Sequence, residues 1–307
     1  MAQERLSIRT PAGWRDRPEA GTVLGIRLMI AFGRLCGRRL LHALLYPVTA
    51  YFYLVRRYER QCSRAFLARV LERPVRRCDV FRHFLQFARV TADRLYFLGR
   101  ERPDIPVTFR GEEALQALVQ ASRHGVFLAA HMGSFEAARV LGPQLGGVAL
   151  HIVLDRQVNL RIMQALEALN PPFAQQIIDS EQGSVELALA ISAALERGHW
   201  VGFLADRHRP RDRTVECDFL GGRARFPVGP FVIASTFKAP LVGIFPRCVG
   251  DGYEIHCEVL SPRLEIPRGN RQAELAAWAQ VYADRLASHA RAAPYSWFNF
   301  FDFWSSP

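Results

Sequence analysis

The stretch Val126-Phe-Leu-Ala-Ala-His131-Met-Gly-Ser-Phe-Glu136 decides the fold. Residues 126–130 are a short apolar run without alternation, which is typical of a central strand covered on both faces. Gly133 permits a sharp turn, and Ser134 is a good N-cap for a helix over residues 135–141. The stretch therefore predicts a buried strand, a tight turn and a helix.

Two residues of this stretch are candidates for chemistry. His131 follows the strand, and Glu136 lies in the first turn of the helix, so both face the crevice where open α/β sheets bind ligands. The H-x4-E spacing lets the carboxylate accept the proton of one imidazole nitrogen, which leaves the other nitrogen free to act as a base. The alternative interpretation is a histidine with one hydrogen bond and a glutamate that favours the helix dipole.

The rest of the chain alternates between strands and helices from about residue 107 onward. This rhythm predicts an α/β fold with a mostly parallel sheet flanked by crossover helices. The expected strands are 107–110, 126–131, 148–154, 175–178, 200–205 and 241–248, with an additional edge strand at 253–260. The expected helices are 112–122, 135–141, 159–169, 184–197, 229–237 and 270–293.

The N-terminal part has a different character. Residues 22–55 are largely apolar but interrupted by arginines, and the longest uncharged run, 40–55, contains His42 and Pro47. A spanning helix needs about 20 apolar residues, so we expect one or two amphipathic helices lying in the membrane interface. The alternative is a pair of helices packed on the protein body. The predicted division is a polar segment 1–21, a helical membrane-associating region 22–100 and an α/β domain 101–307.

The composition narrows the partners. The 307-residue chain carries a net charge of +11, and Lys238 is its only lysine. A basic protein suits an anionic membrane surface or an acidic protein partner. No nucleic-acid-binding pattern is present, so no nucleic acid partner is expected. The six cysteines show no C-x-x-C pair and no His partner at ligand spacing, which predicts reduced thiols and no metal site.

Three further polar loops are expected at the same sheet edge as His131. Their candidate substrate-binding residues are Arg156 and Asn159, then Asp206 and Arg207, then Gly229 and Pro230. Arginines bind phosphate and carboxylate groups, and a Gly-Pro helix start leaves backbone donors beside the crevice. The alternatives are surface ion pairs for the arginines and a turn or cap for Asp206. Together, the loops predict a site for an anionic substrate with a His base.

The C-terminal stretch, residues 294–304, is rich in aromatic side chains. Such a stretch must be covered by lipid or by the fold. Interfacial anchoring and packing against the sheet are both open interpretations.

The blocks quoted above resemble a known family. His131-Met-Gly-Ser-Phe-Glu136 is similar to the H-x4-D/E block of the lysophospholipid acyltransferase superfamily. The order of the later residues, with Phe219-Leu-Gly221 and Gly229-Pro230, resembles its lipid A biosynthesis (lauroyl/myristoyl) acyltransferase branch, and most of all a predicted-acyltransferase subgroup. One departure is that Ala205-Asp206-Arg207-His208 stands in place of the E-G-T-R block that binds glycerophosphate, so lysophosphatidate is not the expected acceptor.

The resemblance implies transfer of a fatty acyl group from a thioester to a hydroxyl of a lipid or glycolipid-like acceptor. His131 would be the general base and Glu136 its partner, with loop amides near Gly133 or at Gly229-Pro230 as candidate oxyanion donors. The implied donor is acyl carrier protein, with acyl-CoA as the alternative, and no metal or redox cofactor is implied. The implied location is the cytoplasmic face of the bacterial inner membrane, peripheral or monotopic. A thioesterase or hydrolase with the same dyad, or a non-catalytic acyl-binding membrane protein, are the other hypotheses.

Overall fold

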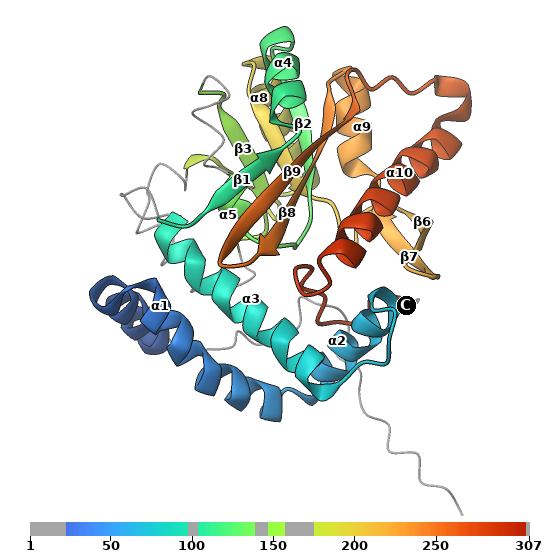
Figure 1. Ribbon diagram of the computed structural model, residues 1–307. Helices are drawn as coiled ribbons and strands as arrows, with labels where there is room; N and C mark the ends of the chain where they lie inside the picture. Colours follow the sequence, from blue (N-terminus) through green and yellow to red (C-terminus); the bar gives the residue numbers. More distant parts are fainter. Residues whose placement is uncertain (1–22, 98–103, 139–146, 157–174, 305–307) are drawn as a thin grey trace, which may run out of the picture.

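The computed structural model describes residues 23–97, 104–138, 147–156 and 175–304 (Figure 1). Its centre is a seven-stranded sheet in the order β1-β9-β8-β2-β5-β3-β4. The strands of this sheet are β1 (Val107–Arg110), β2 (Gly125–Ala129), β3 (Leu150–Leu154), β4 (Ile177–Asp179), β5 (Trp200–Leu204), β8 (Leu241–Val249) and β9 (Gly252–Ser261). The expected α/β fold with a mostly parallel sheet is confirmed.

Strand β2 lies in the middle of the sheet. It pairs in parallel with β5 on one side and with β8 on the other. Strand β9 pairs antiparallel with β8 and parallel with β1, so it is an internal strand. The prediction of an edge strand at residues 253–260 is therefore wrong. Its alternating pattern reflects its two faces, because Tyr253, Ile255 and Cys257 are buried and the residues between them are only partly buried.

Helices cover both faces of the sheet. They are α4 (Glu112–Ala121), α5 (Phe135–Ala138), α8 (Ser184–Glu196), α9 (Gly229–Thr236) and α10 (Arg271–Ala292), together with the N-terminal helices described below. Alternate side chains of β2 enter two different cores. Val126 and Leu128 lie in a core with residues of α9 and α10, whereas Phe127 and Ala129 lie in a core with residues of α4 and α5. Burial on both faces explains the continuous apolar run of β2.

A β-hairpin between β5 and α9 was not expected from the sequence. It consists of β6 (Thr214–Phe219) and β7 (Gly222–Pro227), paired antiparallel. Leu220 and Gly221 form its two-residue turn with φ values of 50° and 75°. Two successive positive φ values match the twist of a tight hairpin. The hairpin is joined to α10 by hydrogen bonds between Asp218 and Gln280, and it closes one side of the cavity described below.

The N-terminal helices are α1 (Val23–Val55), α2 (Arg57–Val70) and α3 (Arg77–Phe97). Helix α1 is interrupted at Gly37 (φ 79°, ψ 170°), so it runs as two helical segments, whereas the sequence left one or two helices open. Figure 1 shows α1 beside α3 at the outside of the fold. Helices α2 and α3 place side chains such as Phe66 and Phe84 in the same core as α9 and α10. In the described part of the chain, no helix is long and apolar enough to cross a bilayer.

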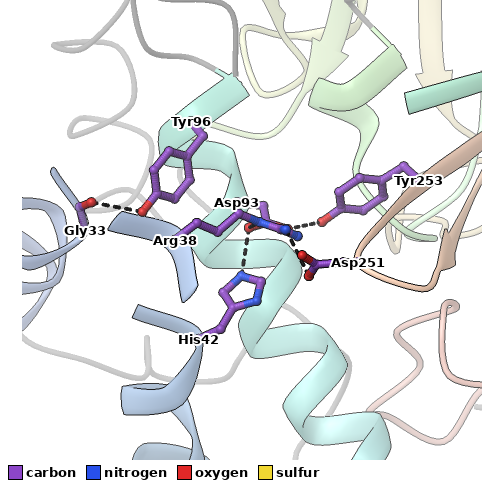
Figure 2. Close-up of polar contacts among 7 residues, drawn as sticks. All are labelled: Gly33, Arg38, His42, Asp93, Tyr96, Asp251 and Tyr253. Carbon is purple, nitrogen blue, oxygen red and sulfur yellow. Dashed lines mark hydrogen bonds and ion pairs between the residues drawn. The ribbon is translucent and has the colours of Figure 1, made fainter. Parts of the chain in front are cut away.

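A buried polar network attaches α1 to the body (Figure 2). Asp93 of α3 is 1% exposed and accepts two hydrogen bonds from Arg38, at 2.8 and 2.9 Å. It also contacts Nε2 of His42 at 2.8 Å and accepts a hydrogen bond from the Tyr253 hydroxyl at 2.6 Å. Burial alone would raise the pKa of Asp93, but these partners lower it. The carboxylate is therefore charged and links α1, α3 and β9.

Some predicted features lie outside the described residues. They are the segment 1–21, the helix at 159–169 with Asn159, and the end of the helix at 135–141. The division of the chain at residues 21 and 100 stays a prediction.

Candidate active site

His131 and Asp206 meet because two neighbouring strands end at the same level. The register pairs Ala129 of β2 with Leu204 of β5, and each functional residue comes two positions after its strand. Nδ1 of His131 lies 2.8 Å from Oδ1 of Asp206, and the backbone N–H of His131 donates to Oδ2 at 3.0 Å. Asp206 is fully buried, while the His131 side chain is 27% exposed. The imidazole is thus anchored at Nδ1, with part of the ring accessible.

The environment favours a neutral imidazole beside a charged carboxylate. Burial and the positive charge of Arg207 lower the pKa of His131, and Asp206 only partly opposes them. Burial would raise the pKa of Asp206, but attraction to His131, the His131 hydrogen bond and Arg207 together lower it to about 2. At neutral pH the Nδ1–H group donates a hydrogen bond to the Asp206 carboxylate. Nε2 then carries the lone pair that a general base needs.

Asp206 has a further donor that the sequence did not reveal. The indole Nε1 of Trp297 donates to Oδ2 at 2.9 Å. Trp297 belongs to the aromatic C-terminal stretch, which packs into the main core. Packing against the protein, one of the two interpretations for this stretch, is therefore what the structure shows for this residue.

Glu136 is a buried carboxylate on α5 next to the imidazole loop. Ser134 Oγ donates to its Oε2 at 3.2 Å, and Nε of Arg94 lies 3.2 Å from its Oε1. Ser134 also accepts the backbone N–H of Ala137, which confirms it as the N-cap. The carboxylate that contacts Nδ1 of His131 is that of Asp206. At this nitrogen, Asp206 therefore takes the position that the sequence predicted for Glu136. The pairing of Glu136 with His131 stays a prediction.

A cavity of about 700 Å³ opens beside His131, a volume typical of ligand sites. Its lining contains polar and charged groups as well as apolar side chains from β3, β5, α8 and α9. The polar lining includes Arg94, His131, Glu136, Asp155, Arg207, Arg209, Arg211 and Arg213; the apolar lining includes Val153, Leu187, Ile191, Phe203, Val232 and Ile233. The cavity therefore offers both ionisable groups and apolar surface to a ligand.

The predicted polar loops converge on this cavity, as the strand-end argument required. Arg207, Gly229 and Pro230 all line it. Arg207 also donates to the Phe298 carbonyl at 2.9 Å. Arg156 follows Asp155 of the lining and is half-buried, while Asn159 lies outside the described residues. Thus the lining brings together residues from three of the loops.

The backbone at the site also separates the oxyanion candidates. The N–H of Gly133 donates to the Ser296 carbonyl at 2.7 Å, so it is engaged within the protein. Gly133 has a φ of 50°, and a Cβ there would meet the Pro246 carbonyl oxygen at 2.5 Å. The start of α9 at Gly229 faces the cavity, where its positive dipole end favours a negative charge.

Among the described residues, no cluster of His, Cys, Asp or Glu side chains is arranged to hold a metal ion.

Comparison with known protein families gives a match over most of the chain. The family model of the bacterial lipid A biosynthesis acyltransferases matches residues 73–306, which is most of the chain. The matched range includes His131, Asp206 and the C-terminal aromatic stretch. The search of curated proteins found no significant match.

Proposed function

The chain belongs to the bacterial lipid A biosynthesis acyltransferase family, and we propose that it moves a fatty acyl group from an acyl thioester to a hydroxyl of a lipid or glycolipid-like acceptor. Family membership implies acyl transfer to a lipid acceptor. The observation that supports the finer proposal is the His131–Asp206 pair, whose imidazole lines a cavity that also has many apolar side chains. A base in a cavity with apolar side chains suits a reaction between a hydroxyl group and a fatty acyl thioester.

His131 acts as the general base. Nε2 takes the proton of the acceptor hydroxyl while its oxygen attacks the thioester carbonyl carbon. The tetrahedral oxyanion then collapses, the carbon–sulfur bond breaks, and the thiolate takes the proton back from the imidazolium. No covalent enzyme intermediate, metal or redox cofactor is needed, because the acceptor attacks the thioester directly.

The carboxylates have separate roles in this proposal. Asp206 fixes the tautomer and stabilises the imidazolium that forms during attack. Glu136 lines the cavity and is proposed as the second carboxylate of the site. In this proposal it is the partner of His131 in the H-x4-E block. Nε of Arg94 lies 3.2 Å from Oε1 of Glu136 and pairs with it in this position.

The remaining lining residues are proposed to bind substrates. The apolar side chains of α8 and α9 accommodate the acyl chain. Arg156, Asn159 and Arg207 bind anionic groups of donor or acceptor, and the α9 start at Gly229 and Pro230 faces the developing oxyanion. Acyl carrier protein is the favoured donor, because it is acidic and this chain has a net charge of +11. Acyl-CoA is the alternative.

The proposed location is the cytoplasmic face of the bacterial inner membrane, with the chain bound peripherally or monotopically. Large apolar side chains of α1 are exposed to solvent, including Leu28 (61%), Leu35 (85%) and Leu54 (70%). Exposed apolar residues on one helix, together with arginines, suit the interface of an anionic membrane.

One assay separates this function from its rivals. Purified protein receives fatty acyl-acyl-carrier protein and a total lipid extract, and the products are resolved by mass spectrometry. The proposal expects a new acylated lipid; free fatty acid alone would indicate a thioesterase, and no product an acyl-binding protein. His131→Ala and Glu136→Ala should each lose most turnover, because general base catalysis contributes about 10² to 10⁴ in rate.

A further inference from the structure

We propose that Trp297 is a positioning residue of the active site, which holds the Asp206 carboxylate in the orientation that His131 requires. The inference rests on the proposed role of His131 as base. Trp297 Nε1 donates to Oδ2 of Asp206 at 2.9 Å, while Oδ1 of the same carboxylate binds Nδ1 of His131 at 2.8 Å. The indole thus contacts His131 through Asp206, and Trp297 is not among the residues that line the cavity.

The backbone around Trp297 is paired with the loop that carries His131. Met132 and Trp297 form an isolated antiparallel bridge. The Gly133 N–H donates to the Ser296 carbonyl at 2.7 Å, and the Phe298 N–H donates to the His131 carbonyl at 2.8 Å. Residues 296–298 therefore act as a short extra strand that fixes the backbone of the catalytic loop.

The indole ring itself has little freedom. Trp297 is 1% exposed. Its ring packs edge-on against Phe66 of α2, Phe219 of β6 and Phe303, with centroid distances of 5.0, 5.3 and 5.0 Å. Its carbonyl contacts Nε2 of the buried His83 at 2.9 Å. Contacts from α2, β6, α3 and the C-terminal stretch therefore hold the indole N–H toward Asp206. A carboxylate that orients the proposed base needs such preorganisation.

The charge balance predicts what this hydrogen bond does. The charged and titratable groups that act on the imidazole or its carboxylate are Asp206, Arg207, Arg94 and Tyr282, and Glu136 lines the same cavity. The indole is an uncharged donor that disperses negative charge from Asp206. Without it the carboxylate attracts the imidazolium more strongly, so the pKa of His131 should rise. A larger fraction of His131 would then be protonated and unable to accept a proton.

The test is Trp297→Phe, which keeps an aromatic ring and removes the donor. The pH dependence of kcat/KM is measured with acyl-acyl-carrier protein and lipid extract. We expect kcat/KM at neutral pH to fall about tenfold, and the acid limb of the profile to move up by about half a pH unit or more. A merely structural role would lower the amount of active protein without moving the limb.

Trp304→Phe is the matched control. Trp304 lies in the same aromatic cluster and donates from its Nε1 to the Phe219 carbonyl at 3.0 Å. This variant loses an equivalent indole hydrogen bond but none to Asp206, so its acid limb should match that of the wild type. An unchanged limb and turnover in Trp297→Phe, with His131→Ala inactive, would overturn the inference and leave the proposed function standing. An active His131→Ala variant would instead overturn the function.

A second measurement covers a Trp297→Phe variant that fails to fold. The chain has five tryptophans, whose indole N–H signals can be followed by NMR in ¹⁵N-labelled wild-type protein. One signal should change its chemical shift with pH along the titration of His131, and lose this dependence in His131→Gln. If no indole signal follows the protonation of His131, the proposal is wrong.

Discussion

Asp206 contacts His131 twice, through Nδ1 at 2.8 Å and through the backbone N–H at 3.0 Å, although 75 residues separate the two. The first contact selects the tautomer with the proton on Nδ1. The second fixes the carboxylate relative to the loop that carries the ring. A single side chain therefore sets both the protonation and the orientation of the proposed base.

The first prediction concerns this carboxylate. Asp206→Asn should lower kcat/KM by about 10² to 10⁴, because the amide can neither stabilise the imidazolium nor enforce the correct tautomer. Asp218→Asn is the matched control, since Asp218 lies in the β6–β7 hairpin with a 79% exposed side chain. Enzyme kinetics and thermal unfolding of both variants check the outcome. Near-normal turnover of folded Asp206→Asn would contradict the role given to Asp206.

The second prediction is a pH profile. The active form of His131 is the neutral imidazole, and burial together with Arg207 lowers its pKa below the ordinary value of 6.5. Activity should therefore fall as the pH drops through the lowered pKa, with an acid limb centred below pH 6.5. The measurement is kcat/KM against pH. An acid limb centred at or above 6.5 would be inconsistent with this environment.

The third prediction tests the arginines. Lysine keeps the positive charge but loses the planar fork that binds phosphate or carboxylate. Loss of a charged hydrogen bond costs about 1.5 to 3 kcal/mol, so kcat/KM of Arg156→Lys and Arg207→Lys should fall roughly ten- to a hundredfold, with little change in Tm.

Arg223→Lys serves as the control for these two variants, because Arg223 binds Asp218 and Glu216 on the hairpin surface. The contrary result would be a large loss of Tm with near-normal kcat/KM. For Arg207 this would mean that its hydrogen bond to the Phe298 carbonyl, and not substrate binding, is its main role.

The fourth prediction concerns membrane binding by α1. Deletion of the helix would remove Arg38 and His42 and leave the buried Asp93 carboxylate with the Tyr253 hydroxyl but without these partners, so substitutions are the better test. The triple variant Leu28→Ser/Leu35→Ser/Leu54→Ser changes only exposed side chains. It should bind anionic vesicles much more weakly than the wild type in a sedimentation assay.

A double variant, Val249→Ser/Val281→Ser, is the control for this experiment, because it removes exposed apolar side chains that do not belong to α1. It should sediment with vesicles as the wild type does. Equal vesicle binding by the triple variant and the wild type would argue against α1 as the membrane-binding element.

Much of the sheet could be predicted from local patterns, because each pattern lies within a few consecutive residues of the sequence. The apolar run of β2, the N-cap Ser134 and the polar loops after the strands were all visible in the sequence and occur as expected. The rule that parallel strands end at one edge correctly gathered His131, Arg207 and Gly229 around one cavity.

The partner of His131 could not be found in this way. The H-x4-E spacing points to a local carboxylate, whereas Asp206 is brought to Nδ1 by the pairing of β2 with β5, and strand order cannot be derived from periodicity. The β6–β7 hairpin did leave a signal, the Gly221-Gly222 pair between two alternating runs. Trp297 left none, because its aromatic neighbours suggested only anchoring in a membrane interface or packing against the sheet.

The pairing of residues 296–298 with the His131 loop also has a consequence for folding. His83 and Trp297 are 214 residues apart in sequence, and Trp297 and Asp206 are 91 apart. Contacts of such long range carry a large loop-closure entropy and form slowly. When denaturant is diluted, helix and strand content should therefore return before activity does. The fluorescence of Trp297, which is buried beside Asp206, would report when the active site forms in a chain that already has its helices and strands.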